Sequence, residues 1–139
     1  MPLMTGEDLL EFQKREFPQT VDMNIVVDEI SDEHISLHME TGERHLRPGG
    51  TVSGPTMMEF ADLTMYFLLL AQIGPVALAV TTNLNINFLR KPEPGVLKAE
   101  GKLLKLGRSL AVGDISIYSG NIEGPVAHVT TTYSIPPKR

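Results

Sequence analysis

The chain has 139 residues, of which 42% are hydrophobic and 21% charged, a balance typical of a globular protein with a single domain spanning 1–139. Its formal net charge of −5 argues against nucleic acid as a partner. It contains no cysteine, which excludes disulfides, a thiolate nucleophile and cysteine ligands for a metal.

The first predicted element is an amphipathic helix over 5–17. Thr5 is a suitable N-cap, acidic residues occupy the first turn, and Pro18 ends the helix. An exported protein would carry a basic, apolar leader in this region. We therefore expect a cytoplasmic protein.

Two strands are predicted next. Apolar and polar residues alternate over 21–28 and again over 34–40, which is the period of a half-buried strand. Asp32 and Glu33 are expected at the turn between them. Residues 41–53 contain several glycines and a proline, so they predict a loop.

A long helix is predicted over 55–72. Its apolar residues cover nearly the whole circumference, so we expect other structure to surround it. Only two charged residues, Glu59 and Asp62, occur between 55 and 73. Carboxylates near the middle of a membrane-spanning helix are costly, so the segment predicts a buried helix and no membrane partner.

Alternation in the second half predicts four strands, at 78–88, 96–106, 110–119 and 126–135. The asparagines of the first of these strands form a polar face that is either solvated or part of a subunit contact. The order of elements predicts an α+β fold in which a mainly antiparallel sheet wraps around the central helix. The tail 136–139 is expected to be loose.

Asp62 is the first candidate for chemistry. A carboxylate inside an apolar helix is costly unless it is paired or functional. The alternative is that Asp62 shares a solvent-exposed stripe with Glu59, three residues earlier. The spacing alone leaves both interpretations open.

The start of the same helix is the second candidate. Backbone N–H groups at a helix N-terminus can bind an anion or an oxyanion. The simpler interpretation is that Ser53 or Gly54 is an ordinary helix cap before Pro55. Gly54 and Asp62 are eight residues apart. That spacing corresponds to about 12 Å along one helix, so a single chain cannot easily direct both at one atom. Two antiparallel helices related by a twofold axis could, which predicts a site shared in a homodimer.

Residues 52–62, Val-Ser-Gly-Pro-Thr-Met-Met-Glu-Phe-Ala-Asp, resemble the motif of the hotdog-fold thioesterases of the PaaI type. In that motif a His-Gly-Gly begins the central helix, and an Asp follows eight residues after the first Gly. Gly54 matches the first Gly and Asp62 matches the Asp. Residues 83–95 resemble the family's next strand and turn, and 105–109 resemble its Gly-Arg strand junction. The resemblance covers nearly the whole chain and implies a hotdog fold.

The resemblance also implies an activity, the hydrolysis of an acyl-CoA thioester by a homodimer or a dimer of dimers. The Gly54 N–H would polarise the carbonyl, and Asp62 of the partner subunit would act as general base or as nucleophile. A hydroxyl from Thr81 or Thr82 would position water. No cofactor is implied beyond coenzyme A as part of the substrate. The implied substrate-binding residues are Ser53, Met58, Thr82, Arg90, Lys91, Arg108 and Ser109, with ordinary surface charge an equal alternative for the three cations.

The sequence departs from the family motif at two positions. Ser53 replaces the His, and Pro55, which has no N–H, replaces the second Gly. A non-catalytic acyl-CoA-binding protein is therefore the alternative function. A hydratase on the same fold is weaker, because such enzymes pair an Asp with a downstream His and no histidine lies in 46–127. The histidines do not follow a metal-binding motif, so no metal is expected.

Overall fold

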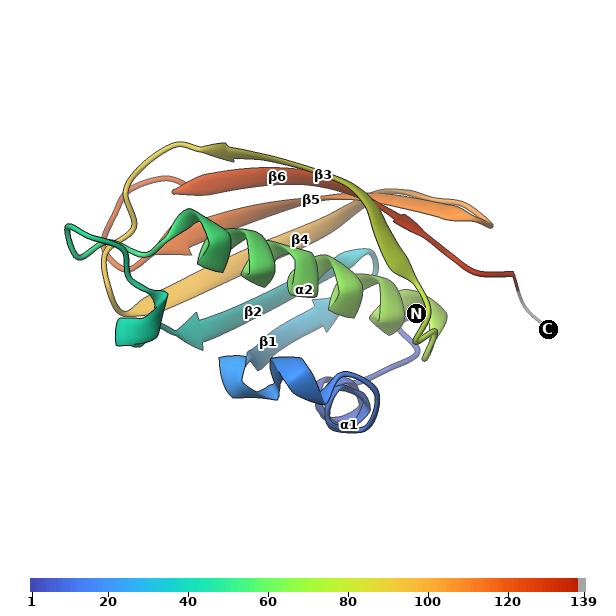
Figure 1. Cartoon of the computed structure of the whole chain (residues 1–139). Helices are drawn as coiled ribbons and strands as arrows, with labels where there is room; N and C mark the ends of the chain where they lie inside the picture. The colour runs from blue at the N-terminus through green and yellow to red at the C-terminus, as the bar shows by residue number, and fades with distance from the viewer. Residues whose placement is uncertain (138–139) are drawn as a thin grey trace.

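The computed structural model describes residues 1–137, so Lys138 and Arg139 of the expected loose tail lie outside the described residues. Six antiparallel strands in the order β1-β2-β4-β5-β6-β3 form one sheet, which curves around helix α2, Gly54–Ile73 (Figure 1). This arrangement confirms the predicted α+β hotdog architecture. The strands are β1 Val26–Ser31, β2 His34–Glu40, β3 Val80–Phe88, β4 Val96–Leu106, β5 Leu110–Ser119 and β6 Ala127–Ser134.

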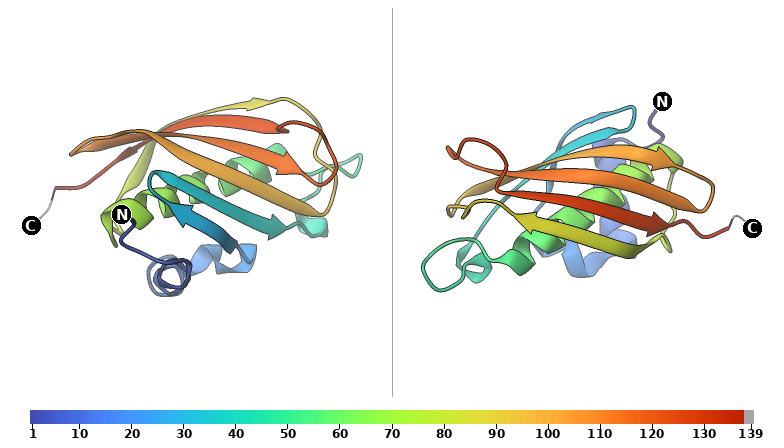
Figure 2. Two further views of the ribbon diagram at one scale, coloured as in Figure 1. Left: turned by 180° about the vertical axis from the view of Figure 1, so that it is seen from behind. Right: turned by 90° about the horizontal axis from the view of Figure 1, so that it is seen from above.

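The N-terminal helix α1, Gly6–Glu16, forms as predicted. Thr5 and Asp8 make a capping box, in which each side chain accepts a hydrogen bond from the other's backbone N–H. Leu9 and Phe12 are buried. The helix lies beside β1, at the opposite edge of the sheet from β3 (Figures 1 and 2).

Two strands begin later than the alternation predicted. The strand predicted over 21–28 is wrong in its first part, because Pro18–Met23 forms a 3₁₀ helix and Asn24 follows with a left-handed φ of 53°. Proline fixes a φ that suits the start of such a helix. Met23 and Ile25 are buried all the same, so their apolar spacing reflected burial and not an extended backbone. Leu78, the predicted start of the next strand, lies in a turn.

A β-bulge interrupts the pairing of β3 with β6. Thr81 pairs with Tyr133, and Asn83 pairs with the adjacent Thr132, so Thr82 is the extra residue. In an uninterrupted strand, successive side chains would point strictly to alternate faces of the sheet. The bulge shifts that alternation, and Thr81 consequently lies across from the buried Tyr133 on the helix-facing side of the sheet.

The two halves of α2 have different surroundings. All residues of Leu63–Ala71 are buried, as expected for a surrounded helix. In the first half a stripe stays uncovered: Pro55, Met58 and Glu59 are exposed, and Asp62 is half-buried at its end. Within the single chain, other elements therefore surround the second half of α2 and leave part of the first half uncovered. No helix in the described part of the chain is long and apolar enough to cross a membrane.

Candidate functional site

Two hydroxyl groups of the sheet hold the carboxylate of Asp62. Thr81 Oγ1, on β3, donates a hydrogen bond to Asp62 Oδ1 over 2.6 Å. The Tyr133 hydroxyl, on β6, donates to the same oxygen over 2.9 Å and lies 3.1 Å from the backbone carbonyl oxygen of Asp62. Because Thr81 and Tyr133 are direct partners across the two strands, both hydroxyls reach the same turn of α2. Within residues 1–137, no protein group donates to Asp62 Oδ2.

Tyr133 is a donor that stays protonated. Its side chain is only 3% exposed, and burial, together with the nearby charge of Asp62, raises the pKa of its phenol far above the ordinary value of 10. The sequence analysis missed this residue. Alternation with the buried Thr131 and Val129 predicts that Tyr133 points inward, but its pairing with Asp62 depends on β6 lying next to β3.

A hollow of about 410 Å³ opens beside Asp62. Aromatic rings line it: Phe17 meets Tyr66 edge-on with ring centroids 6.0 Å apart, and Tyr66 lies 6.1 Å from Tyr133. Asp62 and Thr81 contribute polar atoms to the same hollow. Glu16 and Gln19 line it as well, so the lining is mixed polar and apolar. Polar groups that converge on a hollow fix the orientation of a bound small molecule.

The N-terminus of α2 offers one free backbone donor. Ser53 is the N-cap, so the capping interpretation of the sequence is confirmed for this residue. Its side chain accepts from the Thr56 N–H, and its carbonyl accepts from the Met57 N–H. Pro55 has no N–H. Among the described residues, the Gly54 N–H is therefore the donor of this first turn that has no acceptor.

Gly54 packs against the end of β3. A Cβ atom at this position would lie 3.1 Å from Cζ of Phe88, which is 51% exposed. The eight-residue rise to Asp62 separates the two by about 12 Å along the helix axis. A single chain thus contains both predicted groups but does not bring them together.

The other predicted residues at β3 make contacts of their own. Thr82 does not point to Asp62; its hydroxyl donates to the Thr132 carbonyl at the bulge over 3.2 Å. Of the two threonines, Thr81 is therefore the one whose hydroxyl contacts Asp62. Arg90 donates to the carbonyl oxygen of Pro125, while Lys91 is exposed.

A second, larger hollow lies at the other end of α2. It has a volume of about 1050 Å³, and Arg108 and Ser109 line it together with the apolar Ile73, Val76 and Ile135. Since a helix rises 1.5 Å per residue, the two ends of α2 are about 30 Å apart. The structure therefore places Arg108 and Ser109 far from the N-terminus of α2 in the same chain.

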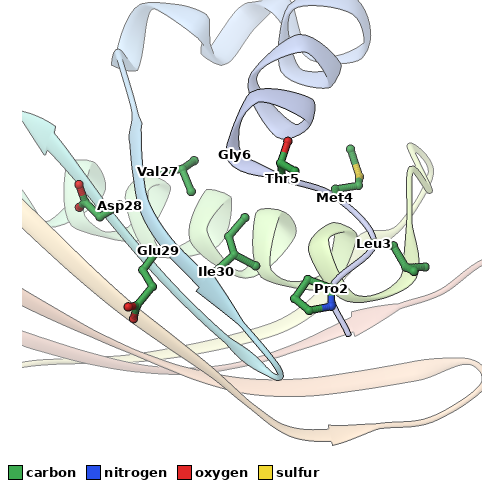
Figure 3. A pocket seen from close by; sticks show the side chains of 9 residues that line it. All are labelled: Pro2, Leu3, Met4, Thr5, Gly6, Val27, Asp28, Glu29 and Ile30. Atoms are coloured by element: carbon green, nitrogen blue, oxygen red, sulfur yellow. The ribbon is translucent and has the colours of Figure 1, made fainter.

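A third hollow lies between residues 2–6 and β1 (Figure 3). Of its two carboxylates, Asp28 is already engaged, with Oδ2 lying 2.8 Å from His38 Nδ1. The described residues contain no group of three histidine, aspartate or glutamate side chains placed to hold a metal ion. This hollow therefore lacks the convergence of carboxylate and hydroxyls found at Asp62.

Comparison with known proteins gives consistent matches. The Thioesterase superfamily model matches residues 49–126. A candidate thioesterase from Silicibacter sp. TM1040 has a similar structure, with 47% sequence identity, a TM-score of 0.89, and coverage of 99% of this chain and 95% of that chain. No curated protein gives a significant match.

More distant solved structures share the fold alone. The Escherichia coli PaaI protein from the phenylacetic acid degradation operon is 17% identical, with a TM-score of 0.81 and coverage of 94% of this chain and 93% of that chain. A Streptococcus mutans protein bound to acetyl-CoA is 23% identical, with a TM-score of 0.72 and coverage of 84% and 91%.

Proposed function

Because the chain belongs to the Thioesterase superfamily, we propose that it hydrolyses an acyl-CoA thioester to the free acid and CoA. The observation that carries this proposal is the half-buried Asp62 carboxylate, which Thr81 and Tyr133 hold at the edge of an aromatic hollow. The acetyl-CoA bound to the similarly folded Streptococcus mutans protein supports a CoA ester as the substrate. The hollow of about 410 Å³ would receive the acyl group.

We infer that a second copy of the chain completes the site. The uncovered stripe of α2 includes Met58, which is 42% exposed, and the neighbouring edge strand β3 leads into Phe88 and Leu89, which are about half exposed. Edge strands with exposed apolar side chains are seldom left bare. Packing two such surfaces about a twofold axis would set the α2 helices antiparallel, with the partner's Gly54 facing Asp62.

In this arrangement the thioester carbonyl oxygen would accept a hydrogen bond from the partner's Gly54. The N–H would stabilise the negative charge that develops on that oxygen as the carbonyl carbon is attacked. Asp62 would either take a proton from the attacking water or attack the carbon directly to give an anhydride that water then cleaves. In both routes the C–S bond breaks, and CoA leaves as a thiolate that takes up a proton. Since Pro55 supplies no second N–H, we expect a single backbone donor.

The nucleotide end of CoA requires cationic partners. Arg108 is exposed, and it is the cationic residue that lines the larger hollow. Lys91 is also exposed, in the segment that follows β3. We propose that these two side chains, one from each subunit because they lie near opposite ends of α2, contact the CoA phosphates, with Arg90 fixing the backbone around Lys91 through Pro125.

The first test is thiol release from short, medium, long and aromatic acyl-CoAs. Asp62→Asn should lower turnover about 10²- to 10⁴-fold, because it removes the proton acceptor and keeps the side-chain shape. Asp114→Asn is the matched control: this carboxylate lies 3.7 Å from His128 on the other face of the sheet. Both variants should keep the wild-type unfolding midpoint and oligomeric state.

The outcomes separate the two candidate functions. Turnover that is unaffected by Asp62→Asn would contradict the mechanism. Saturable binding of an acyl-CoA without any thiol release by the wild type would favour the non-catalytic binding protein, for which Ser53 and Pro55 are the supporting sequence features.

A further inference from the structure

The two oxygens of the Asp62 carboxylate have different surroundings. Oδ1 accepts from both Thr81 and Tyr133, whereas no donor among the described protein groups reaches Oδ2. Two donors on one oxygen fix the rotation of the carboxyl group about its Cβ–Cγ bond. The second oxygen then points in one direction, beside the aromatic hollow.

Tyr133 ties this carboxylate to the sheet through two contacts. Its hydroxyl reaches Oδ1 over 2.9 Å and the backbone carbonyl oxygen of the same residue over 3.1 Å. It therefore restrains both the side chain and the backbone of Asp62. The ring is buried and packs beside Tyr66, which limits the movement of the hydroxyl.

The role of Thr81 also follows from this geometry. Its hydroxyl donates to Oδ1 over 2.6 Å, and a hydroxyl has one hydrogen to donate. The resemblance implied that this side chain would position water. In the structure, the Thr81 hydrogen is engaged with the carboxylate, so Thr81 would contact water only as an acceptor.

We propose that Tyr133 is a positioning residue of the thioesterase reaction: together with Thr81 it holds Oδ1 of Asp62, so that Oδ2 is the oxygen that meets water or the thioester carbon. This inference rests on the proposed function. A hydrogen bond to a charged group is stronger than one between neutral groups, so its loss should have a large effect on the rate. The expected fall in kcat is about 10- to 100-fold.

The test compares Tyr133→Phe with Tyr66→Phe. Tyr66 is a neighbouring buried tyrosine whose hydroxyl donates over 2.9 Å to the carbonyl oxygen of Ala77, away from Asp62. Both variants lose one buried hydroxyl, so both should unfold at a lower urea concentration, and Tyr133→Phe should be the less stable of the two because its hydroxyl contacts a carboxylate. Tyr133→Phe should lower kcat about 10- to 100-fold with KM changed less than about threefold, and this fall should exceed that of Tyr66→Phe at least fivefold.

A purely structural role makes the opposite prediction. Equal losses of kcat in the two tyrosine variants, or a loss that appears in KM alone, would overturn the proposal. If Tyr133→Phe does not fold, Thr81→Val and Thr81→Ser give the same test, because they act on the same oxygen. Thr81→Val should lower kcat about tenfold, and Thr81→Ser, which keeps the hydroxyl, should restore most of it; equal rates for the two would contradict the proposal.

Failure of this inference differs from failure of the proposed function. Wild-type protein that releases no thiol from any acyl-CoA overturns both. Turnover that depends on Asp62 but is unchanged in Tyr133→Phe overturns the positioning role alone and leaves the thioesterase proposal standing.

Discussion

The hollow at Asp62 and the hollow at Arg108 differ in the number of polar groups that line them and in the elements that supply those groups. The first is the smaller, at about 410 Å³, yet α2, β3 and β6 each direct a polar group into it. The second is about 1050 Å³ and is lined mainly by apolar side chains and by the turn between β4 and β5. Its charged group, Arg108, is exposed.

This difference separates chemistry from binding. A reaction needs polar groups held at fixed positions, which the hydroxyl pair on Asp62 provides. A large apolar space lined by one exposed cation can bind a long ligand, but it lacks the fixed polar groups that would polarise a bond. Under the proposed function, the smaller hollow holds the reacting groups, so the number of elements that contribute polar groups is a better guide than volume.

The largest expected effect tests whether the Asp62 hollow is completed by a second chain. Gly54→Pro removes the free N–H and suits the first position of a helix, where the extended Ser53 backbone accommodates it. It and Asp62→Asn should each lower turnover about 100-fold or more. Co-expression of the two variants should restore about a quarter of wild-type activity, because half of the dimers would carry one intact site.

The control for this experiment is Gly54→Ala. It places the same Cβ atom 3.1 Å from Cζ of Phe88 but keeps the N–H. Gly54→Ala should therefore lose less activity than Gly54→Pro. Absence of any recovery in the mixed dimers would show that Gly54 and Asp62 do not combine across two chains. The Asp62 hollow would then have to be described as a site within a single subunit.

The second prediction concerns the larger hollow. Arg108→Ala should raise KM for an acyl-CoA about 3- to 10-fold and leave kcat within about twofold, because an exposed cation contributes to binding a phosphate and not to bond breaking. The wild-type KM should rise with salt, and the variant's KM should rise less. A fall in kcat at constant KM would place Arg108 in the reaction. It would contradict the assignment of binding alone to the larger hollow.

The smallest effect is on stability at alkaline pH, and it belongs to the Asp62 hollow. Burial raises the pKa of Tyr133 above 10, so the unfolded chain releases this proton at a lower pH than the folded chain. The stabilisation is fully present below pH 10 and is lost as the pH rises further, by about 1.4 kcal/mol per pH unit. Urea unfolding at pH 8 and at pH 11 should show this loss in the wild type and a smaller loss in Tyr133→Phe.

Most of the fold could be predicted from the sequence because the hydrophobic period is strong in the central and C-terminal elements. The strand predicted over 96–106 and that over 110–119 have the observed bounds, and α2 differs from its prediction by one residue at each end. The region 21–25 was mispredicted because Met23, at the end of the 3₁₀ helix, and Ile25, after the left-handed Asn24, are both buried, which reproduces the spacing of a strand.

Only some residues of the candidate site could be predicted from the sequence. Asp62 and Gly54 carry a local pattern, namely a carboxylate in an apolar helix and a glycine at its start. Tyr133 carries none, because its contact with Asp62 spans 71 residues and depends on β6 lying beside β3. The choice between Thr81 and Thr82 likewise depends on a bulge that alternation cannot reveal.

The extra residue in β3 decides which of two adjacent threonines faces Asp62. Loss of a single codon at Thr82 would leave a regular strand of acceptable composition, with every other side chain unchanged. In that regular strand Thr81 would lie two residues before Leu84, so its hydroxyl would stay on the helix-facing side, opposite Tyr133. A strand that kept Thr82 but lost the bulge would instead turn Thr82 toward the helix and Thr81 away from it. Among proteins of this fold, the residue that supplies this hydroxyl is therefore identified by the strand pairing and not by its number of residues from the aspartate.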